Sequence, residues 1–487
     1  MNIAKDIENL PTGWTIAALG DHLERITNGL TVNQETEPPG IPVSRIETIS
    51  DGTINFDKVR YVRDIDKQKR EQYLLKSGDI LFSHINSDLH LGKTAIYSSN
   101  RPLLHGMNLL LLRTRKETLD PYYLHYLLNL YRKQGFFIKI AQHAVNQSSL
   151  NQKKITSLKM PLAPLPQQHL IVSEIEKQFS RLDEAVAALK RIKANLKRYK
   201  ASVLKAAVEG KLTEEWRRAN KTKIIPENMG DMFNSKRVLN YNEICKHADK
   251  NGEPKPKKPT NIDTKFSLDE AVLNIMPKIP KEWHYVHIAF ITANAPDSIV
   301  DGPFGSSINV KKDYTEFGIP VIRINNIAPF KFINDNLKYL RKIKFEKLKR
   351  HNIVPGDILF SKVGTIGNSC IYPKGMQEGM LSTTGSCRIR VDDALYHEEF
   401  LCLILNSLKP IFNRIASAGV QPFLNMETIK NFPVPLLNLI EQEKIVKRVD
   451  VLFSVAERIE THVDKGLLRA ERLRQAILKK AFSGRLC

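Results

Sequence analysis

Histidines and glycine-rich loops would be the first residues to support metal or phosphate chemistry in this sequence, and neither occurs in a useful arrangement. The histidines of the first half of the chain include His22, His84, His105 and His143, which lie far apart in the sequence. Their separations do not match the short spacings of metal-ligand sets, so we expect core or surface histidines. Gly364 and Gly367 do not form a dinucleotide-binding fingerprint, and no GxxxxGKS or GxxxxGKT phosphate loop is present. The sequence therefore predicts neither a metal site nor a catalytic site in this chain.

One stretch, Asp120-Pro121-Tyr122-Tyr123, approaches the Asp/Asn-Pro-Pro-Tyr element with which amino-methyltransferases hold the amine that they modify. Its third residue is tyrosine instead of proline, and the matching stretch later in the chain is His397-Glu398-Glu399-Phe400. No glycine-rich loop for S-adenosylmethionine follows a strand. Aspartate followed by proline is typical of the start of a helix, and we prefer that interpretation.

The chain contains two copies of one unit. Residues 147–212 fall onto residues 421–486 at a fixed shift without a gap, and Phe179/Phe453, Leu204/Leu478 and their neighbours are identical pairs. Other pairs precede them in the same order: residues 41–46 answer 319–324, and the two GDILFS strands follow Ser77 and Pro355. Self-similarity in this order indicates an internal duplication.

Each copy ends in a long amphipathic helix. The apolar residues of the first copy follow heptad spacing over residues 167–209, which predicts a helix about 65 Å long. A stripe of this length is stable only when it is covered, and the simplest partner is the other copy. The residues that we expect at this coiled-coil and partner-binding seam are Val172, Ile175, Phe179, Leu182, Leu204, Val446, Val449, Phe453 and Leu478.

Composition favours a polyanionic partner. The chain has 487 residues and a net charge of +22, with a pI near 9.6, an excess found most often in nucleic-acid-binding proteins. The alternative is a merely basic protein with solvated lysines. Five scattered cysteines without a CxxC pair fit a reducing compartment. No secretory leader and no apolar run of membrane length are present, so we expect a soluble, cytoplasmic protein.

Taken together, these features resemble the specificity subunit of a type I restriction-modification enzyme. The resemblance rests on the openings at residues 10–14 and 279–283, the two GDILFS strands, the loop at 301–307, and the helix ends at 209–213 and 483–486. It covers nearly all of the chain except residues 217–278. No single motif establishes the resemblance; it is established by the two sets of motifs, which occur in the same order in both copies.

The resemblance implies an α+β fold with two tandem mixed α/β target-recognition domains separated by two long helices in an antiparallel coiled coil. Its expected boundaries are 1–166 for the first recognition domain, 167–216 for the first long helix, 217–278 for a flexible connector, 279–440 for the second recognition domain and 441–487 for the second long helix. Each domain would read one half of a bipartite site on double-stranded DNA. The helices would set the spacing and dock two modification (methyltransferase) subunits.

The same resemblance places all cofactors outside this chain. S-adenosylmethionine is expected in the methyltransferase subunits, and ATP and Mg in a restriction (motor-nuclease) subunit. DNA contacts are expected from polar side chains in the loops that differ between the copies, because such groups can pair with base edges. These candidates are Asn28, Arg45, Ser83, His84, Asn86, Lys93, Gln147, Ser306, Ser307, Arg323, Lys362, Thr365 and Gln421. Gln147 and Gln421 occupy matching positions, so a role in the scaffold is at least as reasonable for them.

Two other functions remain open from the sequence. One copy could retain chemistry as a fused DNA methyltransferase or nuclease with its own catalytic site, or the chain could be a coiled-coil scaffold without nucleic acid. Methylation of DNA by this chain alone would favour the enzyme. A DNA affinity that does not depend on salt concentration would contradict both the DNA-recognition hypothesis and the fused-enzyme hypothesis.

Overall fold

A computed structural model describes most of the chain. The described residues are 10–50, 52–144, 147–220, 229–252, 254–255, 268–292, 297–417 and 422–486. The chain divides into two compact units, one of which joins the residues up to Ile192 with those from Thr461 onward, while the other runs from Lys193 to Glu460. Each unit thus contains one globular domain together with part of both long helices.

A four-stranded antiparallel sheet with the order β2-β8-β5-β7 forms the centre of the first unit. Its strands are β2 (Leu23–Asn28), β5 (Ile80–Ser83), β7 (Thr94–Ile96) and β8 (Leu109–Thr114). Two smaller sheets are strand pairs: β1 (Thr15–Ala18) with β11 (Lys159–Leu162), and β3 (Ile41–Val43) with β4 (Arg60–Val62). A three-stranded sheet has the order β6 (Ile85–Asn86), β10 (Gln147–Ser149), β9 (Gln142–Ala144). The short helices are α2 (Lys67–Tyr73), α3 (Pro121–Lys133), α4 (Phe136–Ile140) and α5 (Gln152–Thr156).

The second unit repeats this sheet with the order β13-β23-β20-β21. Its strands are β13 (Ile299–Asp301), β20 (Ile358–Ser361), β21 (Ser369–Ile371) and β23 (Ser386–Ile389). A five-stranded sheet has the order β14 (Tyr314–Thr315), β18 (Lys338–Leu340), β15 (Ile319–Ile322), β22 (Gly379–Leu381), β19 (Asn352–Ile353). Two further sheets are strand pairs: β12 (His284–His287) with β24 (Pro433–Leu436), and β16 (Ile327–Ala328) with β17 (Lys331–Phe332). Its helices are α10 (Val310–Asp313), α11 (Lys342–Lys347), α12 (Glu398–Ser407), α13 (Lys409–Ile415) and α14 (Met426–Lys430).

The central sheets are buried on both faces, which explains their continuous apolar strands. In β8, Leu110 and Leu112 lie in the core beneath α3, whereas Leu109 and Leu111 lie in a second core on the opposite face. Successive side chains of a strand point to opposite faces, so a strand covered on both sides is apolar throughout. Both GDILFS strands, β5 and β20, are fully buried for this reason, and the prediction of buried strands is confirmed.

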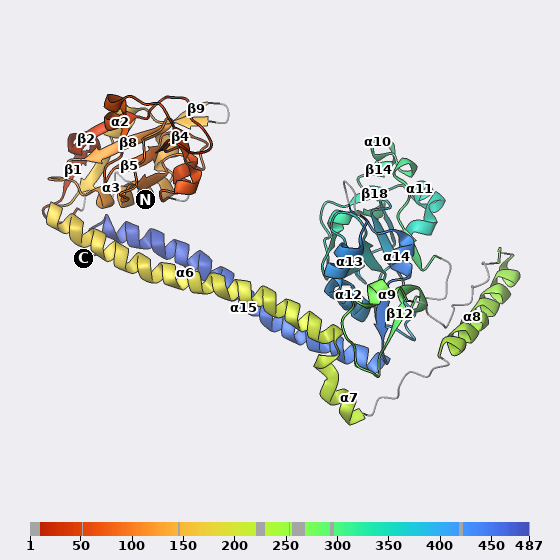
Figure 1. The fold of residues 1–487 in the computed structure, drawn as a ribbon. Coiled ribbons are helices and arrows are strands. Elements are labelled where there is room, and N and C mark those ends of the chain that lie inside the picture. Colours follow the sequence, from red (N-terminus) through yellow and green to blue (C-terminus); the bar gives the residue numbers. More distant parts are fainter. Residues whose placement is uncertain are drawn as a thin grey trace. The chain divides into compact units, whose positions relative to one another are not determined.

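The two long helices are α6 (Leu165–Val208) and α15 (Leu439–Ala481), which lie side by side and run antiparallel within each unit (Figure 1). In the first unit, Leu478 shares a core with Val172 and Ile175. In the second unit, Val203 and Ala207 share a core with Val449. The antiparallel pairing of the two copies and the mixed α+β class are therefore confirmed.

Both long helices end at a glycine that supports the opening of the other domain. Gly210 and Gly484 have a φ of 66°, and a Cβ on them would lie 2.5 Å from Pro280 Cγ and 1.9 Å from Pro11 Cγ. α6 ends at Val208, next to residue 209 where the heptad spacing ended, and a 3-10 turn and α7 (Glu214–Asn220) follow. The connector also contains α8 (Met229–Asn251) and α9 (Glu270–Leu273).

Candidate nucleic-acid interface

In the second domain, an ion pair joins the two loops that carry most of the candidate residues. Lys362, directly after β20, places its Nζ 3.0 Å from the Oδ2 of Asp301 at the end of β13. The Lys362 side chain is 7% exposed, so its ammonium group is committed to this contact. The pair holds the loop of Ser306 and Ser307 beside the loop of Thr365.

Those three side chains differ in exposure. Ser306 and Thr365 are exposed, and Ser307 is half-buried in a 3-10 turn where its N–H donates to the carbonyl of Phe304 at 2.8 Å. Thr365 Oγ1 lies 3.1 Å from Ser361 Oγ. Phe304 is 77% exposed at the tip of the same loop. The loop tips therefore present two hydroxyl groups and one aromatic ring to the surroundings.

A short segment that the sequence reading did not single out connects these loops to Arg323. This segment, residues 382–385, will be called the second junction loop. Its Ser382 N–H donates to the carbonyl of Ile322 beside Arg323, and its Gly385 carbonyl accepts from Lys362 N–H, both at 2.9 Å. A Cβ on Gly302 would lie 2.2 Å from the Thr383 carbonyl oxygen, so backbone touches backbone there.

Arg323 itself is half-buried and partly bonded. Its Nη2 donates to the carbonyl of Asn336 at 2.6 Å. Its Nε is buried without a hydrogen-bond partner among the described residues. Buried donors are normally satisfied, so this nitrogen is available to an acceptor brought by a ligand.

The first domain builds the same arrangement around residues 105–108, the first junction loop. The carbonyl of His105 accepts from Leu30 N–H at 2.8 Å, and Gly106 N–H donates to Ser44 Oγ at 3.0 Å. A Cβ on Gly29 would lie 1.8 Å from the Gly106 carbonyl oxygen. The junction loop thus joins the segment after Asn28 to the segment before Arg45.

Two hollows adjoin Arg45. The smaller, of about 350 Å³, is lined by Val32, Asn33, Gln34, Arg45, Ile46, Glu47, Met107 and Asn108. The larger, of about 720 Å³, shares Arg45 and Glu47 with it and also contains Arg60 and Arg101. Arg45 Nε lies 3.4 Å from Glu47 Oε2. Counted from Gly29 and Gly302, Asn33 and Gln34 fall level with Ser306 and Ser307, a correspondence that aligning the two glycines would have revealed.

The remaining candidates of the first domain form a separate group after β5. Ser83 and His84 are buried, and burial lowers the pKa of His84 to about 4. Asn86 Nδ2 donates to Ser83 Oγ at 3.2 Å, and Lys93 Nζ donates to the carbonyl of Ser50 at 2.5 Å. These contacts favour a structural role for this set, whereas Asn28 and Gln147 are exposed. Gln421 lies outside the described residues.

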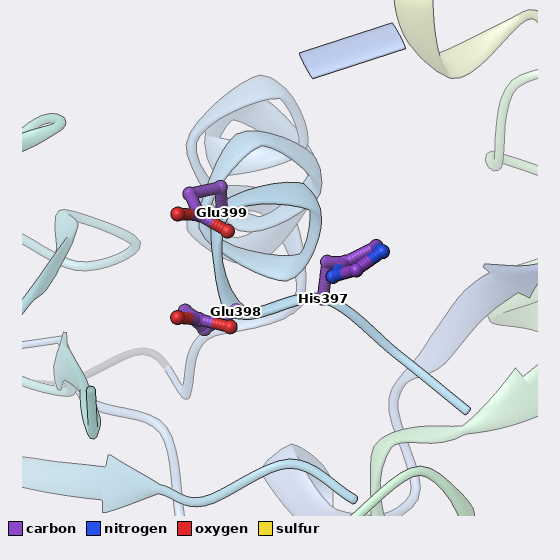
Figure 2. Close-up of side chains that lie close together, drawn as sticks. All are labelled: His397, Glu398 and Glu399. Atoms are coloured by element: carbon purple, nitrogen blue, oxygen red, sulfur yellow. The ribbon is translucent and has the colours of Figure 1, made fainter. Parts of the chain in front are cut away.

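A cluster of metal-ligand-type side chains lies at the start of α12. Among the described residues, one group of three neighbouring ligand-type side chains is present, His397, Glu398 and Glu399, whose ligand atoms lie within 4.8 Å of one another. Figure 2 shows Glu398 and Glu399 in the first turn of α12 and His397 at the residue before it, with the two carboxylates projecting on one side and the imidazole on the other. Lys374 Nζ lies 4.0 Å from Glu398. Consecutive acidic residues at a helix start also stabilise the helix dipole, so this group has a structural explanation.

The stretch Asp120-Pro121-Tyr122-Tyr123 is a helix cap. Asp120 Oδ1 accepts from the N–H groups of Tyr122 and Tyr123, both at 2.9 Å, and α3 begins at Pro121. Asp120 thus occupies the capping position that Asp-Pro predicts. The helix-start interpretation is confirmed.

The expected seam residues fall into two environments. Val172, Ile175 and Leu478 are buried in the first unit, and Val449 in the second. Leu204, Val446 and Phe453 pack at the edge of the second core, while Phe179 packs at the edge of the first, and Leu182 is half-buried. Many of these side chains therefore also support a recognition domain. Exposed apolar residues of the long helices include Leu170, Val451 and Leu468.

The sequence matches the family described as "Type I restriction modification DNA specificity domain" over residues 11–198 and 304–468, more than half of the chain. The chain belongs to this family. Among its relatives in the specificity-subunit family, the putative type I restriction enzyme MjaX specificity subunit of Methanocaldococcus jannaschii is 30% identical, covering 94% of this chain and 92% of that protein. The type I restriction enzyme EcoKI specificity subunit of Escherichia coli K12 is 23% identical, covering 98% and 90%.

Solved structures from type I restriction-modification systems share the fold. One, from work on complex assembly and conformational transition of the type I R-M system, has a TM-score of 0.60 at 17% identity and covers 98% of this chain and 99% of its own. The HsdS subunit of Thermoanaerobacter tengcongensis has a TM-score of 0.51 at 16% identity, covering 98% of both chains. Family membership makes this chain a DNA-recognition subunit of a type I system and not its catalytic subunit. None of the helices in the described ranges has the length and apolar character that crossing a membrane requires.

Proposed function

We propose that each of the two domains reads one half of a bipartite site on double-stranded DNA, and that the paired long helices set the distance between the half-sites. The observation that carries this proposal is the shared scaffold with different loops. The central four-stranded sheets of the two domains correspond strand for strand, whereas Met107 and Asn108 of the first junction loop stand where the second has Thr384 and Gly385. Two similar readers with different surfaces fit two different half-sites.

Charge supports DNA as the ligand. The chain carries a net charge of +22, and cations around α11 remain without an ion-pair partner among the described residues, including Lys342 and Lys347. Lysines of this kind neutralise phosphates without reading sequence, and they make affinity fall as salt rises. Base specificity then depends on the loops that meet at the junction loops.

The finer assembly is part of the same proposal. Two methyltransferase subunits dock on the long helices, where Leu170, Val451 and Leu468 are 62%, 55% and 55% exposed. Exposed apolar side chains on a helical surface are typical of a partner-binding face. S-adenosylmethionine belongs to those methyltransferase subunits, ATP and Mg to a restriction subunit, and this chain carries no cofactor of its own. The complex works in the cytoplasm.

Reconstitution with the methyltransferase subunits tests the proposal. The complex is expected to methylate adenines in a two-part sequence with an unread spacer, and omission of this chain abolishes that pattern. Exchange of residues 304–309 should change one half-site only. A continuous recognition sequence would contradict two separate readers, and methylation by this chain without partners would favour the fused-enzyme alternative.

A further inference from the structure

Three chain segments meet at an equivalent place in both domains. They are a glycine-containing loop (residues 29–34 or 302–307), the segment that leads into Arg45 or Arg323, and the junction loop (105–108 or 382–385). At Gly29 and Gly302 the contact with the junction loop is so close that an added Cβ would lie 1.8 Å and 2.2 Å, respectively, from a carbonyl oxygen of that loop. The backbone at this meeting point is therefore tightly packed in both domains, whereas the exposed side chains on it differ between the two domains.

Most of the side chains that vary at this point are polar, and all of those named below are at least partly exposed. In the first junction loop, Met107 is 41% exposed and Asn108 is also exposed. In the second, Thr383 is exposed and Thr384 is half-buried. A surface whose backbone is shared and whose polar side chains differ can read two different sequences from the same position.

The hollow of about 350 Å³ in the first domain contains an amide without a protein partner. Gln34 Nε2 is buried and has no hydrogen-bond acceptor among the described residues, and Asn33 and Asn108 line the same hollow. Arg45 and Glu47, its charged neighbours, already pair with each other at 3.4 Å. A buried donor left unsatisfied costs free energy that a ligand acceptor recovers, so the amides are the groups available for recognition.

We propose that the junction loops are base-reading elements, with Asn108 and Gln34 contacting base edges of one half-site and Thr384 contacting those of the other. The inference rests on the proposed function and names specificity-determining residues for it. Asparagine and glutamine amides can each donate and accept a hydrogen bond at once, the pattern that the N6 and N7 edge of adenine presents in the major groove. A threonine hydroxyl can form a hydrogen bond with several different bases, so Thr384 recognises base edges differently from the amides of Asn108 and Gln34.

Three variants in the reconstituted complex test the inference. Asn108→Gly removes the amide but keeps the backbone, since Asn108 has a φ of 66° that glycine adopts freely. Gln34→Glu keeps the size and replaces the donor by an acceptor. Thr384→Val keeps the shape and removes the hydroxyl. Asn100→Gly, at an exposed asparagine elsewhere in the first domain, is the matched control.

The readout is the methylated sequence, determined at every position of both half-sites. Asn108→Gly is expected to lose about ten- to hundredfold of its discrimination at a base pair of one half-site. Gln34→Glu should change the base preferred in that same half-site, and Thr384→Val should act on the other half-site. The control variant should retain the parent sequence.

An unchanged recognition sequence in all three variants, with methylation intact, would overturn the inference and leave the bipartite reading in place. Equal loss in both half-sites would also overturn it, because a base-reading residue acts within its own half-site. A parent complex without any two-part preference would instead refute the proposed function itself.

Discussion

Arg113 and Asp79 form a bidentate ion pair in the first unit, with Nε 2.7 Å from Oδ1 and Nη2 2.8 Å from Oδ2. Arg390 and Asp357 repeat the pair at the same distances in the second unit. Asp79 also accepts from Lys76 N–H at 2.7 Å. The aspartate of each GDILFS strand therefore closes the preceding turn and ties its strand to the neighbouring one, β8 or β23.

Removal of Arg113 should destabilise the first unit. Asp79 is 1% exposed, and Arg113→Ala would leave its carboxylate charged and unpaired inside the protein. Breaking a buried pair in this way costs about 3–5 kcal/mol. Urea unfolding measures the loss, and Arg70→Ala on the exposed face of α2 is the control. Equal stability of the two variants would contradict a supporting role for the pair.

Alanine at either helix-ending glycine should destabilise the unit whose domain it supports. Gly484→Ala would drive a Cβ to 1.9 Å from Pro11 Cγ, and Gly210→Ala to 2.5 Å from Pro280 Cγ. Gly135 also has a positive φ, of 70°, but open space around its Cβ position. Gly135→Ala therefore shares the backbone strain of about 1 kcal/mol without the clash. Thermal unfolding should rank both helix-end variants well below this control.

The stability of the second unit should depend on Arg217, which pairs with a buried carboxylate that the first unit replaces by a neutral amide. Glu441 is 1% exposed and accepts from Arg217 Nε at 2.9 Å and from Trp283 Nε1 at 3.1 Å. Arg217→Ala should cost about 3–5 kcal/mol because it leaves the carboxylate unpaired. In the first unit the corresponding acceptor is neutral, since Trp14 donates to Gln167 at 2.9 Å.

That difference supplies a rescue experiment. Glu441→Gln combined with Arg217→Met should recover most of the lost stability, because it recreates the neutral arrangement of the first unit. Denaturant unfolding of the two single variants and the double variant gives the coupling between the residues. Additive losses in the double variant would show that the two side chains do not act on each other.

Acid should weaken the first unit through a buried histidine. Burial lowers the pKa of His125 from 6.5 to about 4, and its ring contacts Thr94 Oγ1 and Asn129 Nδ2 at 3.1 Å. The unfolded chain takes up the proton first as pH falls below 6.5, so the stability present at neutral pH is lost toward pH 4. At pH 5 the loss is about 2 kcal/mol.

The measurement is the melting temperature at pH 7 and pH 5 in the parent and in His125→Gln. The variant should lose less stability between the two pH values, whatever its stability at pH 7. His169→Gln, at an exposed position, should retain the pH dependence of the parent. An identical pH dependence in His125→Gln would contradict the assignment.

Charge on the exposed faces of the long helices should impair assembly without harming the fold. Val451→Asp and Leu468→Asp change side chains that are 55% exposed, so their effect on stability should stay within about 0.5 kcal/mol. Binding of methyltransferase subunits should weaken at least tenfold in a pull-down or titration. Leu89→Asp and Phe317→Asp, at exposed apolar residues of the recognition domains, are the controls.

Much of this architecture could be predicted because it depends on local or repeated patterns. The heptad spacing gave the long helices, Asp120 and Pro121 gave the start of α3, and Ile-Leu-Phe gave the buried strands. The heptad spacing ended at residue 209, and α6 ends at Val208, but the contact of Gly210 with Pro280 joins residues far apart in sequence. Amphipathic spacing alone does not reveal such a contact.

The site was harder to predict because polarity does not distinguish a free side chain from a paired one. Lys362 has the chemistry of a phosphate contact, yet Asp301 holds its ammonium group at 3.0 Å. Gln34 is an ordinary loop residue by sequence, and only the fold places its amide beside Asn108 in one hollow. Both outcomes depend on long-range packing, which composition and spacing do not encode.

The closure of the first core by Leu478, Ala481 and Phe482 sets an order on biogenesis. A ribosome releases the strands and α3 of that domain long before it reaches these residues. The domain that is synthesised first is consequently the last to complete its core. Until α15 emerges, the apolar residues that it will cover must be protected by a chaperone or by other parts of the nascent polypeptide.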